Sequence, residues 1–140
     1  MDYREEVFSA RWHLDVVRRM MIGFDEYESK RFLVGVIKEL AKASGKLVRA
    51  FLIMDGTKGN LNVFVERVGA KYLDREDVEI LVKVLDIERA QRVSRAELMK
   101  KGELLFEVDG NWRVLSIERL KFFADVVDRI ARNFPTTIKR

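Results

Sequence analysis

The chain has 140 residues, of which 48% are hydrophobic and 36% charged, and its net charge is +4. This length and hydrophobic content favour one domain with a substantial core and disfavour a disordered chain. The absence of cysteine and the presence of a single histidine, His13, disfavour enzyme classes that depend on thiolates or on several imidazoles.

Apolar residues at alternating steps of three and four predict a first helix over residues 4–22, which Gly23 ends. A second apolar ridge, at steps of four, widens the apolar face of this helix. We therefore expect the helix to pack against more than one neighbour. The ridge comprises Phe8, Trp12, Val16 and Met20.

Asp25 and Glu28 have the spacing of a capping box, which predicts the start of a second helix. Apolar residues continue along it as a heptad seam with one polar member, Ser44. A helix over residues 26–54 is roughly 43 Å long at ~1.5 Å per residue. We expect a helix of this length to form the spine of a bundle.

Two shorter helices are predicted next, over about 60–70 and, after the cap Asp74, over about 75–92. The second of these carries two apolar stripes on nearly opposite sides. One stripe can face the bundle, and the other is an unusual surface for a monomer. We predict that this other stripe forms a two-fold homodimer interface, or else lies under the hairpin that follows. It comprises Ile80, Val84 and Ile87.

Residues 104–115 predict a small β-hairpin around the polar loop Asp109–Asn111. A three-residue loop pairs Val108 with Trp112, and the pairs that follow also match in character. Helices flank the hairpin on both sides. Before it, a capping box at 94–97 predicts a short helix that ends at Gly102; after it, a last helix begins at the cap Ser116.

These elements predict a mainly α fold: an up-and-down bundle of four to six helices with one long helix. We expect a single domain over 1–134 and a frayed tail over 135–140. No apolar run approaches the ~18 residues that span a membrane, and the N-terminal residues lack a signal-peptide pattern. We therefore expect a cytoplasmic protein without membrane contact. High charge with few thermolabile residues favours a thermophilic source.

Cationic residues gather in two places and predict contacts with the phosphates of RNA or a nucleotide. Acids such as Glu39 and Glu88 lie among them, so a solvated face of mixed charge is the alternative interpretation. The first set, along the 26–54 helix, is Lys38, Lys42, Lys46 and Arg49; the second is Arg89, Arg92, Arg95, Lys100 and Lys101.

His13 allows two interpretations. The first is a Ser9–His13 pair completed by Asp125 or Asp128, as a nucleophile and base held by an orienting acid. The second, which we favour, is an imidazole packed between helices with one nitrogen hydrogen-bonded. Neither clustered metal ligands nor a phosphate-binding loop after a strand is evident, so we expect no metal and no cofactor.

The pattern of residue types over Ala96–Phe134 resembles the HEPN superfamily of small helical bundles, especially archaeal members of unassigned role. Three segments carry the resemblance: Glu97–Gly102, Leu104–Val108 and Leu115–Leu120. The resemblance implies a bundle that often dimerises and often works beside a nucleotidyltransferase-like partner.

Many members of this superfamily are ribonucleases that use an arginine and a histidine separated by four to six residues. The only histidine here is His13, and Glu6, Val7 and Phe8 occupy the positions that would need arginine. The ribonuclease mechanism of the superfamily therefore cannot be assigned to any residue of this chain.

Together these observations predict a non-catalytic, dimeric interaction module that acts with a protein partner of nucleotidyltransferase or toxin–antitoxin type. One alternative is an RNA-binding or nucleotide-binding protein that uses the two cationic sets. Another is a divergent ribonuclease built on arginines and acids in place of histidine.

Overall fold

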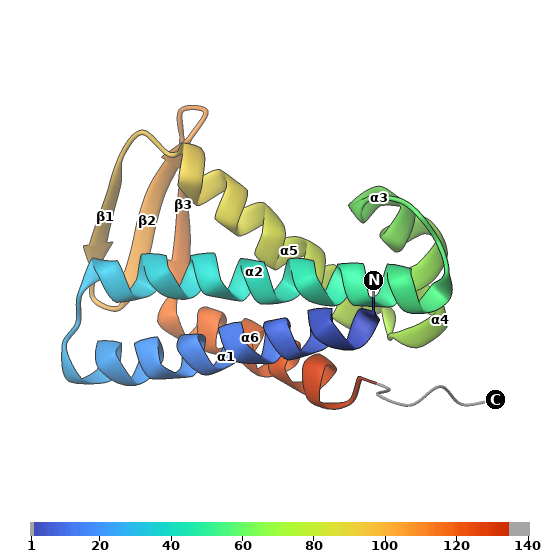
Figure 1. The fold of residues 1–140 in the computed structure, drawn as a ribbon. Helices are drawn as coiled ribbons and strands as arrows, with labels where there is room; N and C mark the ends of the chain where they lie inside the picture. The colour runs from blue at the N-terminus through green and yellow to red at the C-terminus, as the bar shows by residue number, and fades with distance from the viewer. Residues whose placement is uncertain (1, 135–140) are drawn as a thin grey trace.

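Two long antiparallel helices form the frame of the fold in the computed structural model, which describes residues 2–134 (Figure 1). A short helical segment, a third long helix, a sheet and a last helix follow them along the chain. The helices are α1 (Tyr3–Glu26), α2 (Lys30–Asp55), α3 (Leu61–Val63), the π-helix η1 (Phe64–Val68), α4 (Gly69–Tyr72), α5 (Arg75–Val93) and α6 (Ile117–Arg132), and the strands are β1 (Glu97–Lys100), β2 (Glu103–Val108) and β3 (Asn111–Ser116).

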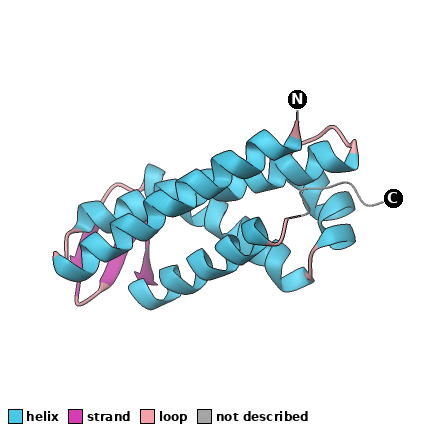
Figure 2. Cartoon of the chain, turned by 60° about the horizontal axis from the view of Figure 1, so that its bottom comes forward, coloured by secondary structure: helices cyan, strands magenta, loops and turns pink. Residues whose placement is uncertain are grey.

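The prediction of a mainly α fold with one long helix and a small hairpin is confirmed, and the sheet has three antiparallel strands in the order β1-β2-β3. The sheet lies at one end of the α1–α2 pair and the α3–α4 segment at the other (Figures 1 and 2). Helix α2 is the spine, because α1, α5 and α6 all contact it. The predicted tail, 135–140, lies outside the described residues. Within residues 2–134, no helix has the length and apolarity that crossing a membrane requires.

The first helix is longer than predicted and passes through Gly23 to Glu26. Its extra turn places Phe24 in the core at 2% exposure, and this burial outweighs the roughly 1 kcal/mol that a helical glycine costs. Gly23 serves a different purpose, since a Cβ there would lie 2.8 Å from the ring of Phe32 on α2. The predicted capping box is also wrong: Ser29 caps α2 and accepts a hydrogen bond from the backbone N–H of Arg31.

The predicted helix over 60–70 is interrupted by a π-helical turn. Asn60 caps α3, and the backbone then widens into η1 before it returns to the α-helical form in α4. Phe64 and Val68 from η1 are fully buried. The following helix, α5, matches its predicted range closely and begins, as expected, after Asp74.

The short helix predicted after residue 94 is wrong, because this segment forms strand β1. Helix-forming residues fill Glu97–Lys100, yet pairing with β2 overrides their propensity. Met99 lies opposite the buried Leu104 in this pairing. Gly102 does not end a helix; with Lys101 it forms a turn of positive φ between β1 and β2.

The β2–β3 hairpin has a two-residue loop, not the predicted three-residue loop. Asp109 and Gly110 both have positive φ, at 53° and 82°, which is the backbone of a type I′ turn. The shorter loop moves every pair by one residue, so that Val108 lies opposite Asn111 and not opposite Trp112. Because side chains alternate between faces, the shift decides which residues of β3 face the core.

The end of α2 is tied to α4 by a polar cluster around Asp55. This carboxylate accepts hydrogen bonds from the hydroxyl of Thr57, the hydroxyl of Tyr72 at 2.7 Å and the ammonium of Lys71 at 3.2 Å. The hydrogen bonds from Thr57 and Tyr72 hold the pKa of Asp55 below its ordinary value of 3.8. The bond to Asp55, together with burial, raises the pKa of Tyr72.

We expect Asp55→Asn to lower the melting temperature at neutral pH. Because folding lowers the pKa of Asp55, its carboxylate stabilises the fold above pH ~4. That contribution is lost as the pH falls through the lowered pKa, so the gap between wild type and variant should shrink below pH ~4. Melting curves from pH 7 to pH 3 measure the gap. Asp109→Asn, in the exposed β2–β3 turn, is the control, and an equal gap for Asp55→Asn at all pH values would contradict the assignment.

A second prediction concerns Ser44, the polar member of the apolar seam of α2. It is fully buried, and its hydroxyl has no hydrogen-bond partner among the described residues. We expect Ser44→Ala to raise the free energy of unfolding by about 1 kcal/mol, because it removes an unsatisfied polar atom. Ser9→Ala, at a half-buried position of α1, measures the gain from helix propensity alone. Equal gains in urea unfolding would contradict the prediction.

Candidate functional site

The first cationic set lies on α2, where acids of the α1–α2 seam neutralise most of it. Lys42 pairs with Glu39 of α2 at 3.6 Å. Lys46 and Arg49 approach the buried carboxylate of Glu6, on α1, at 3.7 and 3.9 Å. Lys38 is exposed and has no ion pair within residues 2–134. The stripe therefore presents less positive charge than its sequence indicates.

The second cationic set is divided by strand β1. Arg89 and Arg92 lie in the last turns of α5, and Arg92 pairs with Glu88 at 3.7 Å. Arg95 precedes β1, whereas Lys100 and Lys101 lie at its far end. Five residues of extended chain separate Arg95 from Lys100 by roughly 16 Å. These five cations are thus exposed but do not form one compact patch.

The apolar stripe predicted as a dimer interface does not lie on the surface. Val84 is 3% exposed, and Ile80 and Ile87 pack partly buried against the core. The expectation of an exposed stripe is wrong because α5 has neighbours on several sides: it contacts α2, α6 and β2. Trp112 does not cover the stripe either, because it lies opposite Glu107, on the face of the sheet away from the buried Leu104 and Phe106.

His13 pairs with a carboxylate that the sequence did not indicate. Its Nδ1 atom lies 2.5 Å from Oε2 of Glu39, on α2, and both side chains are mostly buried. Of the two postulated orienting acids, Asp128 binds Arg18 and Arg132, and the carboxylate on the imidazole is that of Glu39. The structure therefore does not assemble the Ser9–His13–Asp arrangement. Among the described residues, no group of three His, Asp or Glu side chains can hold a metal ion.

The outer face of α1 carries two exposed aromatic side chains, which we call the α1 aromatic pair. Phe8 is 66% exposed and Trp12, one turn later, is 62% exposed. The sequence predicted that they would pack against a second neighbour together with Val16 and Met20, and only the latter two are partly buried. The prediction failed because α2 and α6 cover the opposite side of α1 and no element of the described chain covers its outer face.

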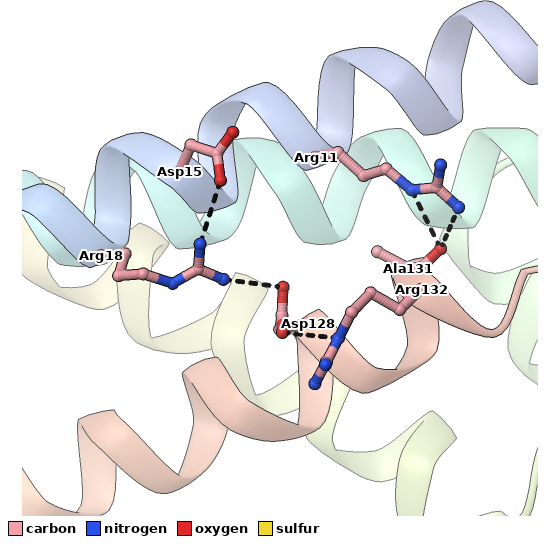
Figure 3. Close-up of polar contacts among 6 residues, drawn as sticks. All are labelled: Arg11, Asp15, Arg18, Asp128, Ala131 and Arg132. Carbon is pink, nitrogen blue, oxygen red and sulfur yellow. Dashed lines mark hydrogen bonds and ion pairs between the residues drawn. The ribbon is translucent and has the colours of Figure 1, made fainter.

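A polar network joins α1 to α6 beside the aromatic pair, and Figure 3 shows the side chains of the network. Arg11 donates from Nε and Nη2 to the carbonyl oxygen of Ala131, at 3.3 and 3.0 Å. This carbonyl belongs to the last turn of α6, where carbonyl groups lack helical partners and favour a cation. The guanidinium of Arg11 also lies 6.0 Å from the ring centroid of Phe8. Further along α1, Arg18 bridges Asp15 and Asp128, and Arg132 binds the second oxygen of Asp128.

A second network, between α1 and α2, lies on the other side of the pair. It consists of the His13–Glu39–Lys42 contacts and the approach of Lys46 to Glu6. The edge of the Trp12 ring packs against the imidazole of His13, with ring centroids 5.0 Å apart. The pair therefore stands between two polar rims whose charges are largely satisfied within the protein. An apolar centre with a polar rim is the usual anatomy of a protein–protein interface.

A groove of about 590 Å³ lies between η1 and α5, away from these features. Its lining is mostly apolar and includes Leu61, Val65 and Val82, with Glu66 and Lys83 among its polar residues. Its size lies in the range of small-molecule sites. The groove contains none of the residues that the sequence analysis selected.

Comparison of the chain with protein-family models, with curated proteins and with solved structures gives no match. The resemblance to the HEPN superfamily therefore stays a prediction from the sequence.

The polar contacts of Glu39 between α1 and α2 lead to a prediction about stability. Glu39→Gln removes the partly buried charge that His13 and Lys42 share, and we expect it to lower the free energy of unfolding by about 1–2 kcal/mol. Lys42→Gln removes only an exposed partner and should cost less than about 0.5 kcal/mol. Urea unfolding at pH 7 measures both values. Equal effects of the two substitutions would show that Glu39 has no special role in this rim.

Proposed function

We propose that the protein is a non-catalytic interaction module and that a partner protein binds it at the α1 aromatic pair. The observation that carries the proposal is the exposure of Phe8 and Trp12, at 66% and 62%, on a helix whose other faces are packed. Aromatic residues are enriched among the residues that dominate binding energy at protein interfaces.

The free energy gained by covering the two rings supports their role as the anchor of an interface. Covering the exposed parts of the two rings removes roughly 250 Å² of mostly apolar surface from water, which favours binding by about 6 kcal/mol at ~25 cal/mol/Å². Association costs several kcal/mol in lost translational and rotational freedom. The pair therefore supplies the centre of an interface, and further contacts at the rims are needed for a stable complex.

The charges favour a protein over a nucleic acid at this surface. Arg18, Lys42 and Arg132 all have acidic partners within 4 Å, so binding a phosphate chain would require breaking existing ion pairs. Arg89, Arg95, Lys100 and Lys101 have no ion pair within residues 2–134 and support RNA binding as a second candidate function. The divergent ribonuclease is a weaker proposal, because Arg92 is paired with Glu88.

The class of partner comes from the sequence resemblance. Residues 96–134 resemble the HEPN superfamily, and the proposal therefore names a nucleotidyltransferase-type or toxin–antitoxin-type protein as the partner. The same resemblance supports a homodimer.

The test is affinity purification of the tagged chain from its native host. We expect the wild type to retain a stoichiometric protein partner and Phe8→Ser/Trp12→Ser to lose it, because the variant removes the apolar centre of the interface. The control is Tyr27→Ser/Phe122→Ser, which removes two exposed rings elsewhere, at 74% and 55% exposure. Far-UV circular dichroism verifies that all three proteins are folded.

Equal recovery of partners by the wild type and the Phe8→Ser/Trp12→Ser variant would contradict the proposal. A purified partner then allows a direct titration, since Trp112→Phe leaves Trp12 as the only tryptophan. Its emission should shift to shorter wavelength as the ring is buried. Salt-dependent binding of labelled RNA that is lost in Arg89→Ala/Arg95→Ala would favour the second candidate.

A further inference from the structure

Strand β3 is an edge strand of the sheet, and most of its residues are exposed to solvent. The strand order is β1-β2-β3, so one side of β3 has no neighbouring strand among the described residues. Its first four residues, Asn111–Val114, are all exposed, on both faces of the sheet. Two of them are large apolar residues: Trp112 is 51% exposed and Val114 56%. An exposed, apolar edge strand is a template for pairing with another strand.

The hairpin register shows which backbone groups are free. In a two-residue type I′ hairpin, the residues that close the loop, here Val108 and Asn111, exchange both hydrogen bonds. The bonded pairs then alternate along the ladder, so Arg113 is bonded to β2 and its two neighbours are not. The N–H and C=O groups of Trp112 and Val114 therefore point away from β2, along the free edge.

A row of aliphatic side chains crosses the outer face of the sheet and ends at that edge. Leu98 lies opposite Leu105, and Leu105 lies opposite Val114, so that each strand contributes one residue. Leu98 is 44% exposed, and Leu105 is partly exposed. Trp112 flanks the row on β3. Within residues 2–134 of a single copy, this apolar row stops at Val114.

We propose that a second copy of the chain pairs with this edge, β3 against β3 in antiparallel orientation, about a two-fold axis between opposed Val114 residues. The free groups of Val114 then bond those of the same residue in the second copy. The aliphatic row becomes continuous over six strands, as Leu98, Leu105 and Val114 followed by the same residues in reverse order. A surface that complements itself in this way is what a two-fold contact requires.

Charge favours this register over the register that is shifted by one residue. Moving the axis to Arg113 would place two arginine side chains directly opposite each other, with Cβ atoms about 4.5–5.5 Å apart, and like charges in opposed positions destabilise a strand pair. With Val114 on the axis, Arg113 lies opposite Leu115 and keeps its ion pair with Asp86 of its own chain, at 3.2 Å. Moving the axis to Trp112 would break the aliphatic row.

The contact is small, and its size sets the conditions of the test. About this axis residues 112–116 can pair, and five residues at about 3.3 Å each span roughly 16 Å, so the contact covers less than the about 800 Å² per partner of a standard interface. We expect a dimer that dissociates on dilution. It gives the proposed homodimer a surface and does not depend on the α1 aromatic pair, which lies on the N-terminal half of α1, away from the sheet (Figure 1).

The absence of cysteine from the chain permits a direct test. Opposed residues in a hydrogen-bonded antiparallel pair have Cα atoms about 5.5 Å apart, within the range of a disulfide. In the proposed dimer Val114→Cys should therefore oxidise to a covalent dimer about 10-fold or more faster than Leu98→Cys at equal concentration. Leu98 lies on the outer strands of the six-stranded sheet, roughly 24 Å from its counterpart.

A second variant tests the non-covalent association. Val114 is exposed, so Val114→Lys keeps the fold and places two like charges on the axis. We expect sedimentation of the wild type to show a dimer whose fraction rises with concentration, and Val114→Lys to weaken it at least about 10-fold, while Leu98→Lys retains it. A wild type that stays monomeric, equal oxidation of the two cysteine variants, or a dimer unaffected by Val114→Lys would each overturn the proposal. None of these outcomes bears on partner binding at α1.

Discussion

The close packing of α1 against α2 is the constraint on which the rest of the structure depends. A Cβ at Gly23 would lie 2.8 Å from Phe32, and one at Gly35 would lie 2.8 Å from the sulfur of Met20. Glycines at these two points therefore let the helices approach closely near the turn that joins them. α2 then offers its remaining surface to α5 and α6, while α1 retains one uncovered face. The exposure of Phe8 and Trp12 follows from this arrangement of neighbours.

Helix packing also determines how many of the cationic side chains are neutralised by acids. The chain has a net charge of +4, yet many of its cations face acids across helix contacts, as Lys46 faces Glu6 and Arg129 faces Asp77. The pair between Arg129 and Asp77 is bidentate, with distances of 3.1 and 2.7 Å, and it raises the pKa of Arg129 further above its ordinary value. Bidentate pairs of this geometry are the surface ion pairs most able to add stability, and pairs across helix contacts also fix how the helices lie. They also leave the aromatic pair between two neutralised rims, which suits a protein partner better than a phosphate chain.

The sheet end is governed by two short turns. Lys101–Gly102 and Asp109–Gly110 have positive φ and connect strands through two-residue loops. These turns place Leu104 and Leu115 toward the core and leave Leu98, Leu105 and Val114 on the outer face. One face of α1 and one edge of the sheet are thus exposed and apolar, and they lie toward opposite ends of the long helices (Figure 1). A partner on α1 and a second copy on β3 would not compete for the same residues.

The sequence alone determined the long helices, the spine and the existence of a hairpin before the last helix, because apolar periodicity and turn residues are local signals. It did not determine that residues 97–100 form a strand, since strand pairing overrides helix propensity only in the folded chain. Nor did it determine that Val84 is buried and that Trp12 is exposed to solvent. Periodicity shows which residues are apolar, but the number of neighbours around each helix decides which of them are covered. Tertiary structure also decided that Glu39 faces His13, because residues 26 positions apart meet only when α1 and α2 pack together.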